Sequence, residues 1–292
     1  MKHLWFLTIA AYILGALAAE TIKAEEQTNI PQQGIKLAYS FSPGKINRYK
    51  IVQKITGTRT ITGSATTDLD MQLTSIIRMR CTKTLENGKV EIAIDTEDEY
   101  MKISGKAIYG YKPSKDVRTI QLNPNGSISS SSTSNQKEPK RRHALDFGAV
   151  ESILLLAILP DKPVAPGDVW SAEMPLPIDT KSKLKLDFQL EEIKTSPGGQ
   201  VAIIKQKLTT PINEANESQE EGTRGSQAGE STLTFDISNG RLISANGSIH
   251  TKIETPISVP PVPGSTPSRT VQIVDVTSNY TIELLPEQNK AQ

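Results

Sequence analysis

The sequence has few of the residues that carry most protein chemistry. It holds one cysteine, Cys81, and three histidines, His3, His143 and His250. A single cysteine excludes an intramolecular disulfide, and metal sites of the usual kind need pairs or triads of converging ligands. We therefore predict no metal site, and we expect an apolar core rather than cross-links to hold the fold together.

The motifs of common hydrolases and nucleotide-binding enzymes are also missing. No segment reads G-x-S-x-G, H-E-x-x-H or G-x-x-x-x-G-K-[ST], and such segments place a nucleophilic serine, a zinc ion or a phosphate. Cys81 shares a strand face with apolar residues, where burial makes a thiol inert. We predict that the protein is not an enzyme, with no catalytic residue and no cofactor. Hydrolysis by a pair of carboxylates stays open as an alternative, because their separation depends on the fold.

Charge of one sign is not in excess. The 33 Lys and Arg residues balance the 32 Asp and Glu residues, for a formal net charge of +1. A nucleic-acid or anionic-membrane surface needs clustered positive charge. The basic cluster Lys140 to Arg142 follows a serine-rich tract and is interpreted as part of a solvated linker. The sequence therefore predicts no nucleic-acid partner.

The first residues have the order of a secretory signal peptide. Lys2 precedes an apolar run from Leu4 to Leu14, and Ala16-Leu17-Ala18 follows it. The run is shorter than the roughly twenty residues that span a bilayer. We expect cleavage after Ala18, so that residues 1–18 are a leader and the mature protein is exported, periplasmic or extracellular, without a stable transmembrane span. Retention of the leader as an anchor stays open.

Two-residue periodicity dominates the rest of the chain. Apolar and polar residues alternate from Ile35 to Phe41 and, over about thirteen residues, from Leu69 to Cys81. Strands this long indicate a tall, curved sheet, and Asn-Gly pairs such as Asn87-Gly88 mark hairpins. We predict a mainly β protein with long curved antiparallel sheets, arranged as a half-barrel or sandwich.

One segment departs from this periodicity. Residues Leu145 to Leu159 are apolar nearly all round, which is typical of a helix buried on most sides, and Pro160 ends it. We expect the helix to lie in the concave face of the sheet. Trp170 follows a Pro-Gly-Asp turn and is predicted to be the structural anchor of the corner between helix and strand.

The order of turns and strands repeats along the chain, which predicts two similar meanders. The first meander is expected over 35–128, a polar linker over 129–143, and the helix with the second meander over 144–285. A resemblance supports this plan. The second part begins with a characteristic string and continues with Phe235-Asp236 and Gly240; the string reads Leu159-Pro160-x-x-Pro163-Val164-x-Pro166-Gly167-Asp168-x-Trp170.

This pattern resembles a family of uncharacterised secreted bacterial proteins with a signal peptide and a β-rich repeat. The resemblance covers about Ile35 to Leu285, implies an exported β protein of unknown function, and transfers no catalytic residue. A tall curved sheet with an inserted helix also resembles periplasmic lipoprotein carriers in architecture alone.

These observations favour an exported, non-enzymatic binding or envelope-interaction protein with a protein partner. If the sheet does not close completely, an extended partner can form main-chain hydrogen bonds with its free edge strands. The first alternative is a carrier of a lipid or other apolar ligand, held in the concave sheet where methionines make an adaptable lining. The residues predicted to line such a site are Leu69, Met71, Leu73, Ile77, Met79 and Leu155.

Overall fold

Long antiparallel strands make up most of the computed structural model, which describes residues 34–108, 117–133, 157–175, 183–196, 198–213, 222–259 and 268–287. A short 3-10 turn, Glu86–Gly88, follows the second strand. The strands are β1 Ile46–Ile61, β2 Thr67–Thr84, β3 Val90–Ile103, β4 Lys106–Ala107, β5 Arg118–Leu122, β6 Ile128–Thr133, β7 Val169–Pro175, β8 Lys183–Ser196, β9 Gly199–Asn213, β10 Arg224–Asp236, β11 Arg241–Val259 and β12 Ser268–Leu284.

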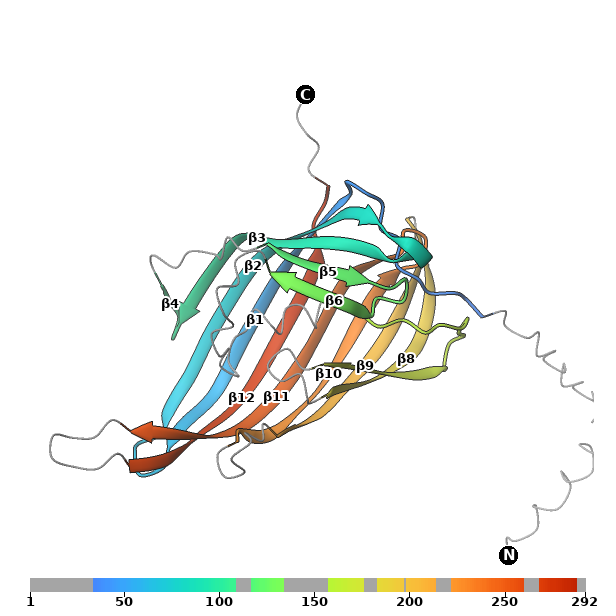
Figure 1. The fold of residues 1–292 in the computed structure, drawn as a ribbon. Helices are drawn as coiled ribbons and strands as arrows, with labels where there is room; N and C mark the ends of the chain where they lie inside the picture. Colours follow the sequence, from blue (N-terminus) through green and yellow to red (C-terminus); the bar gives the residue numbers. More distant parts are fainter. Residues whose placement is uncertain are drawn as a thin grey trace, which may run out of the picture. The chain divides into compact units, whose positions relative to one another are not determined.

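These twelve strands form one sheet in the order β6-β5-β3-β2-β1-β12-β11-β10-β9-β8-β7, with β4 paired to β3. The first and last strands, β1 and β12, are therefore neighbours in the middle of the sheet, and they join a meander from each half of the chain. The sheet curls until it is nearly closed (Figure 1). The prediction of long, curved antiparallel strands is confirmed.

The predicted buried helix is not seen. Ala157, Ile158 and Leu159, its last residues, are buried but not helical, and the rest of the segment lies outside the described residues. The Asn87-Gly88 hairpin is present between β2 and β3, with Asn87 at a φ of 59°. β6 continues to Thr133, so it takes up the first residues of the predicted linker.

The prediction of a strand from Ile35 to Phe41 is wrong, although its alternation is real. The segment forms only an isolated bridge between Ile35 and Val164. Its other backbone bonds go to turns, from the Tyr39 N–H to the Pro124 carbonyl and from the Ser40 N–H to the Gly240 carbonyl. The alternation arises because the segment packs over one end of the sheet.

Apolar side chains on the concave face form the core. Tyr39 in the segment before β1 stacks on Phe41 at 5.6 Å and meets the fully buried Phe235 edge-on at 5.2 Å between ring centroids. A smaller cluster lies elsewhere, made of Ile55, Val274 and Val276. The core thus consists of one large cluster and one small one.

The ladder registers also align the inward-facing residues into rows that cross the sheet. One row is polar in its middle and aromatic at its end, and it runs from β1 to β7 through Gln53, Tyr280, Gly247, Ser231, Gln206, Phe188 and Trp170. Ser231 Oγ donates to Gln206 Oε1 at 2.6 Å. Burial raises the pKa of Tyr280, and its hydrogen bond with Ser231 opposes that rise. The row ends at the edge strand β7, beside the candidate site.

Candidate functional site: the cleft beside the edge strand

The sheet ends at β6 on one side and at β7 on the other, and within the described residues these two strands are not paired with each other. β7 pairs only with β8, and the bond from the Leu190 N–H to the Asp168 carbonyl sets the phase of that ladder. In an antiparallel ladder alternate residues direct their backbone groups to opposite sides. The N–H and C=O groups of Val169, Ser171 and Glu173 therefore point away from β8, toward the open edge.

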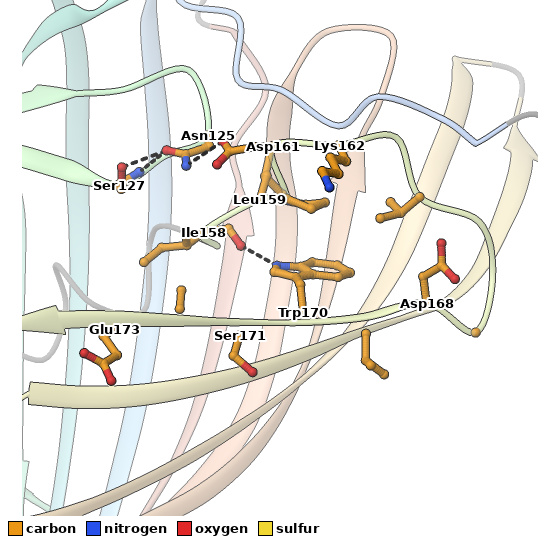
Figure 2. A pocket seen from close by; sticks show the side chains of 15 residues that line it. Asn125, Ser127, Ile158, Leu159, Asp161, Lys162, Asp168, Trp170, Ser171 and Glu173 are labelled. Carbon is orange, nitrogen blue, oxygen red and sulfur yellow. Dashed lines mark hydrogen bonds between the residues drawn. The ribbon is translucent and has the colours of Figure 1, made fainter.

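A cleft of about 770 Å³ runs along this edge. We call it the seam cleft (Figure 2). Its lining residues come from the β5–β6 hairpin, from the segment after Ala157 and from β7: Asn125, Ser127, Ile158, Leu159, Pro160, Asp161, Lys162, Val164, Gly167, Asp168, Val169, Trp170, Ser171, Ala172 and Glu173. Residues from both faces of β7 line the same cleft. This arrangement places the cleft beside the edge of the strand, and Val169 is 73% exposed there.

The floor of the seam cleft is apolar and firmly held. The indole of Trp170 stacks on Phe188 with ring centroids 5.4 Å apart and planes 10° from parallel. Its Nε1–H donates to the Ile158 carbonyl at 2.8 Å, as Figure 2 shows. Ile158 and Leu159 are 7% and 2% exposed. These contacts fix the segment after Ala157 against β7.

The Pro-Gly-Asp turn before β7 explains why the sequence places Trp170 here. Gly167 adopts a φ of +96°, which a residue with a side chain rarely does. Its N–H donates to the Leu190 carbonyl at 2.7 Å. Asp168 Oδ2 accepts the Ala165 N–H at 2.8 Å and so closes the turn. The turn directs the chain into register with β8, and Trp170 falls on the inner face.

A chain of hydrogen bonds forms the opposite rim of the cleft. Asn125 Nδ2 donates to Asp161 Oδ1 at 3.2 Å, and Asn125 Oδ1 accepts from Ser127 N–H at 3.0 Å and Ser127 Oγ at 2.7 Å. The Leu159 N–H also donates to the Asn125 carbonyl at 2.7 Å. The Lys36 ammonium donates to the Asp161 carbonyl. The rim therefore links the β5–β6 hairpin to the segment before β7.

The charges on the lining are predominantly negative. Asp161, Asp168 and Glu173 are acidic and Lys162 is basic, which gives a formal balance of −3 + 1 = −2. Glu173 Oε2 accepts from Lys183 Nζ at 2.9 Å, but both side chains are more than half exposed. Among the described residues, no group of three or more His, Cys, Asp or Glu side chains is placed to hold a metal ion. The arrangement suits binding of an extended, positively charged chain.

The residues predicted to line an apolar ligand site lie elsewhere. Leu73, Ile77 and Met79 are 6%, 3% and 3% exposed, and Leu69 and Met71 are half-buried against the smaller cluster. None of these five lines the seam cleft, and Leu155 lies outside the described residues. Cys81 is buried at 2% exposure, and burial raises the pKa of its thiol.

Sequence reasoning identified Trp170 but missed its neighbours in the cleft. Ala172 and Val169 carry no motif, and their importance comes from the position of β7 at the end of the sheet order. Asn125 precedes a glycine, which indicates a turn, but nothing in the sequence shows that its side chain joins two segments. The one usable signal was a short strand with Pro166 shortly before it and Pro175 as its last residue, which is typical of an edge strand.

Fold and cleft together define a class: a nearly closed antiparallel β-sheet protein with a cleft beside an open edge strand. No protein-family model matches the chain, and no curated protein matches it either. The resemblance based on the Leu159 to Trp170 string therefore stays a prediction. In the part of the chain that the structure describes, no helix is long and apolar enough to cross a membrane.

Proposed function

We propose that this protein is an exported, non-enzymatic binding protein that takes up an extended segment of a partner polypeptide at the open edge of β7. The observation that carries the proposal is the seam cleft along this edge, toward which Val169, Ser171 and Glu173 direct their backbone groups. Exposed edges bind extended peptides through main-chain hydrogen bonds, and pockets for alternate side chains provide selectivity. Export rests on the leader sequence.

An apolar-ligand carrier is the second candidate, and one observation favours it. The cleft floor contains the apolar side chains of Ile158, Leu159, Trp170 and Ala172. A cleft of this size is within the range of small-molecule sites. The two candidates differ in the interactions that hold the ligand, because an apolar molecule forms no hydrogen bonds with the backbone N–H and C=O groups of β7.

The substitution Ser171→Pro separates the two candidates. Proline removes the N–H that Ser171 presents to the open edge, and edge strands tolerate proline. It also removes the hydrogen bond from Ser171 Oγ to Asp187 Oδ1, 2.6 Å long. Ser171→Ala is the matched control, because it loses the same side-chain bond and keeps the N–H.

The test is selection of a random peptide display library on the purified protein. We expect the selected peptides to bind the unmodified protein and Ser171→Ala equally, and to bind Ser171→Pro about tenfold more weakly, the effect of losing one or two well-placed hydrogen bonds. Thermal melts check that the unmodified protein and both variants are folded. Peptides that bind Ser171→Pro as tightly as Ser171→Ala, or a library from which nothing is enriched, contradict the proposal.

A further inference from the structure

The inner face of β7 has a gap in its side-chain volume. The three inward residues are Trp170, Ala172 and Met174, so one small side chain lies between two large ones. Ala172 pairs with Leu186 of β8, which is completely buried and fills the space on that side. On the other side Ala172 faces the seam cleft, where Ile158 forms part of the lining. Among the described strands none pairs with this side of β7, and the seam cleft lies beside Ala172.

A strand that pairs with the β7 edge places its alternate side chains on the same face as Trp170 and Ala172. The side chain opposite Ala172 then enters the space between Ala172 and Ile158. That space is walled by Trp170, Ile158 and Leu159. Because these walls are apolar, an apolar side chain gains the most there, and a charged one loses its hydration.

The rest of the lining determines the charge of the partner. The formal balance of −2 comes from side chains on two sides of the cleft, Asp161 and Asp168 before β7 and Glu173 on it. Lys162 is the basic lining residue. The carboxylates of Asp161 and Asp168 accept hydrogen bonds from neutral groups, the Asn125 amide and the Ala165 N–H. Glu173 is paired with Lys183, and the Lys36 ammonium contacts the Asp161 carbonyl, so the charge that is left for a partner is mainly that of Asp161 and Asp168. Lysine or arginine side chains on either side of the apolar residue complement this distribution.

We infer that the partner is a cationic, extended polypeptide segment that inserts one apolar side chain over Ala172. The inference rests on the proposed function, since it needs a strand paired with β7. It adds the pattern of the segment: an apolar residue facing inward, flanked along the chain by basic residues. The apolar residue provides most of the binding free energy, and the basic residues mainly speed association.

The probe is a fluorescently labelled peptide with the length of β7, seven residues, with a leucine at its centre, a lysine at each end and threonines between. Binding is measured by fluorescence anisotropy. We expect the leucine-to-alanine version of the peptide to bind about tenfold more weakly, as expected for one buried leucine side chain. Glutamates in place of the lysines are expected to weaken binding further, more strongly at low ionic strength than at high.

Two protein variants test the same contacts from the other side. Ala172→Leu fills the space and is expected to weaken binding of the leucine peptide at least about tenfold, whereas the control Ala172→Ser keeps the space. Asp161→Asn keeps the oxygen that accepts from Asn125 but removes the charge. We expect it to weaken binding about two- to fivefold and to reduce the dependence on salt.

The outcomes distinguish the inference from the proposed function. Loss of binding in Ser171→Pro with full binding in Ala172→Leu leaves the edge pairing in place and overturns the apolar anchor. Equal binding of the lysine and glutamate peptides overturns the charge assignment. If the leucine peptide binds Ser171→Pro, Ala172→Leu and the unmodified protein alike, or binds none of them, both the inference and the proposed function fail.

Discussion

The middle of the sheet and its seam are built from similar strands, but they differ in whether the backbone groups of the strands have hydrogen-bond partners on both edges. β1 pairs with β2 on one edge and with β12 on the other, and its inward Ile51 is 2% exposed. Among the described strands β7 pairs with β8 alone, and its inward Trp170 is only half-buried. Main-chain groups are matched throughout the middle but point into a cleft at the seam. We therefore expect the middle to contribute more to stability, and our proposal places recognition at the seam.

The largest expected effect separates a core aromatic residue from a seam aromatic residue. Phe235 is fully buried, whereas Trp170 is half-buried and also lines the cleft. We expect Phe235→Ala to lower the free energy of unfolding by roughly 4 kcal/mol and Trp170→Ala by roughly 3 kcal/mol. Urea denaturation of both variants measures the difference.

Trp170→Ala, compared with Trp170→Phe, also tests the predicted anchor role of Trp170. Its stack on Phe188 and its bond to the Ile158 carbonyl are the contacts that the substitution removes. Trp170→Phe keeps a ring but loses the Nε1–H, so it should fall between Trp170→Ala and the unmodified protein. A Trp170→Ala midpoint unchanged from that of the unmodified protein would show that the stack does not stabilise the corner.

The alternation of apolar and polar residues was sufficient to predict the strands of the middle but not the closure of the sheet. The run from Leu69 to Cys81 became β2, because most of its inward side chains are apolar and buried, although the inward Ser75 is polar. The run from Ile35 to Phe41 has the same pattern and yet lies across the sheet end. A two-residue period predicts which side chains are buried, but it does not predict whether they are buried within a sheet or by packing against one.

The site was harder to predict than the fold for a related reason. An edge strand is defined by the partner that it lacks, and the order of strands across a sheet depends on all the ladders together. Trp170 was recognisable because it is large and follows a Pro-Gly-Asp turn. Ala172 is small and follows no motif, and the role that we propose for it depends on β7 having no second partner among the described strands.

A glycine in the polar row gives a second comparison, with a smaller effect. A Cβ atom added at Gly247 would lie 2.6 Å from the Glu230 carbonyl oxygen and 2.8 Å from the Tyr280 hydroxyl. We expect Gly247→Ala to destabilise the protein by roughly 2 kcal/mol, because backbone or a buried ring must shift. At Gly63, on the turn after β1, no atom lies within 4 Å of the added Cβ.

Gly63→Ala is therefore the control for crowding, although its φ of +85° adds strain of its own. The double variant Gly247→Ala with Tyr280→Phe decides whether the hydroxyl causes the clash. Relief of more than about half the cost would assign the clash to Tyr280, and no relief would assign it to β10, where the Glu230 carbonyl oxygen and the Ser231 Cβ both lie 2.6 Å from the added atom. Thermal denaturation followed by circular dichroism provides the values.

The smallest expected effect concerns two ion pairs, one over the middle of the sheet and one at the seam. Arg48 on β1 donates to both carboxylate oxygens of Glu97 on β3, at 2.8 and 2.7 Å. Lys183 and Glu173 make a single contact with side chains 68% and 58% exposed. The Arg48 hydrogen bonds hold the pKa of Glu97 below its ordinary value.

A lowered carboxyl pKa stabilises the folded state above the unfolded value, about 4.3, and this contribution is lost as the pH falls through the lowered folded value. Arg48→Gln should therefore cost up to about 1 kcal/mol near neutral pH and progressively less below about pH 4. Lys183→Gln should cost nothing measurable at either pH, because its pair is solvated. Urea melts at both pH values test this prediction, and an Arg48→Gln cost that persists in acid would mean that Arg48 acts through packing rather than through Glu97.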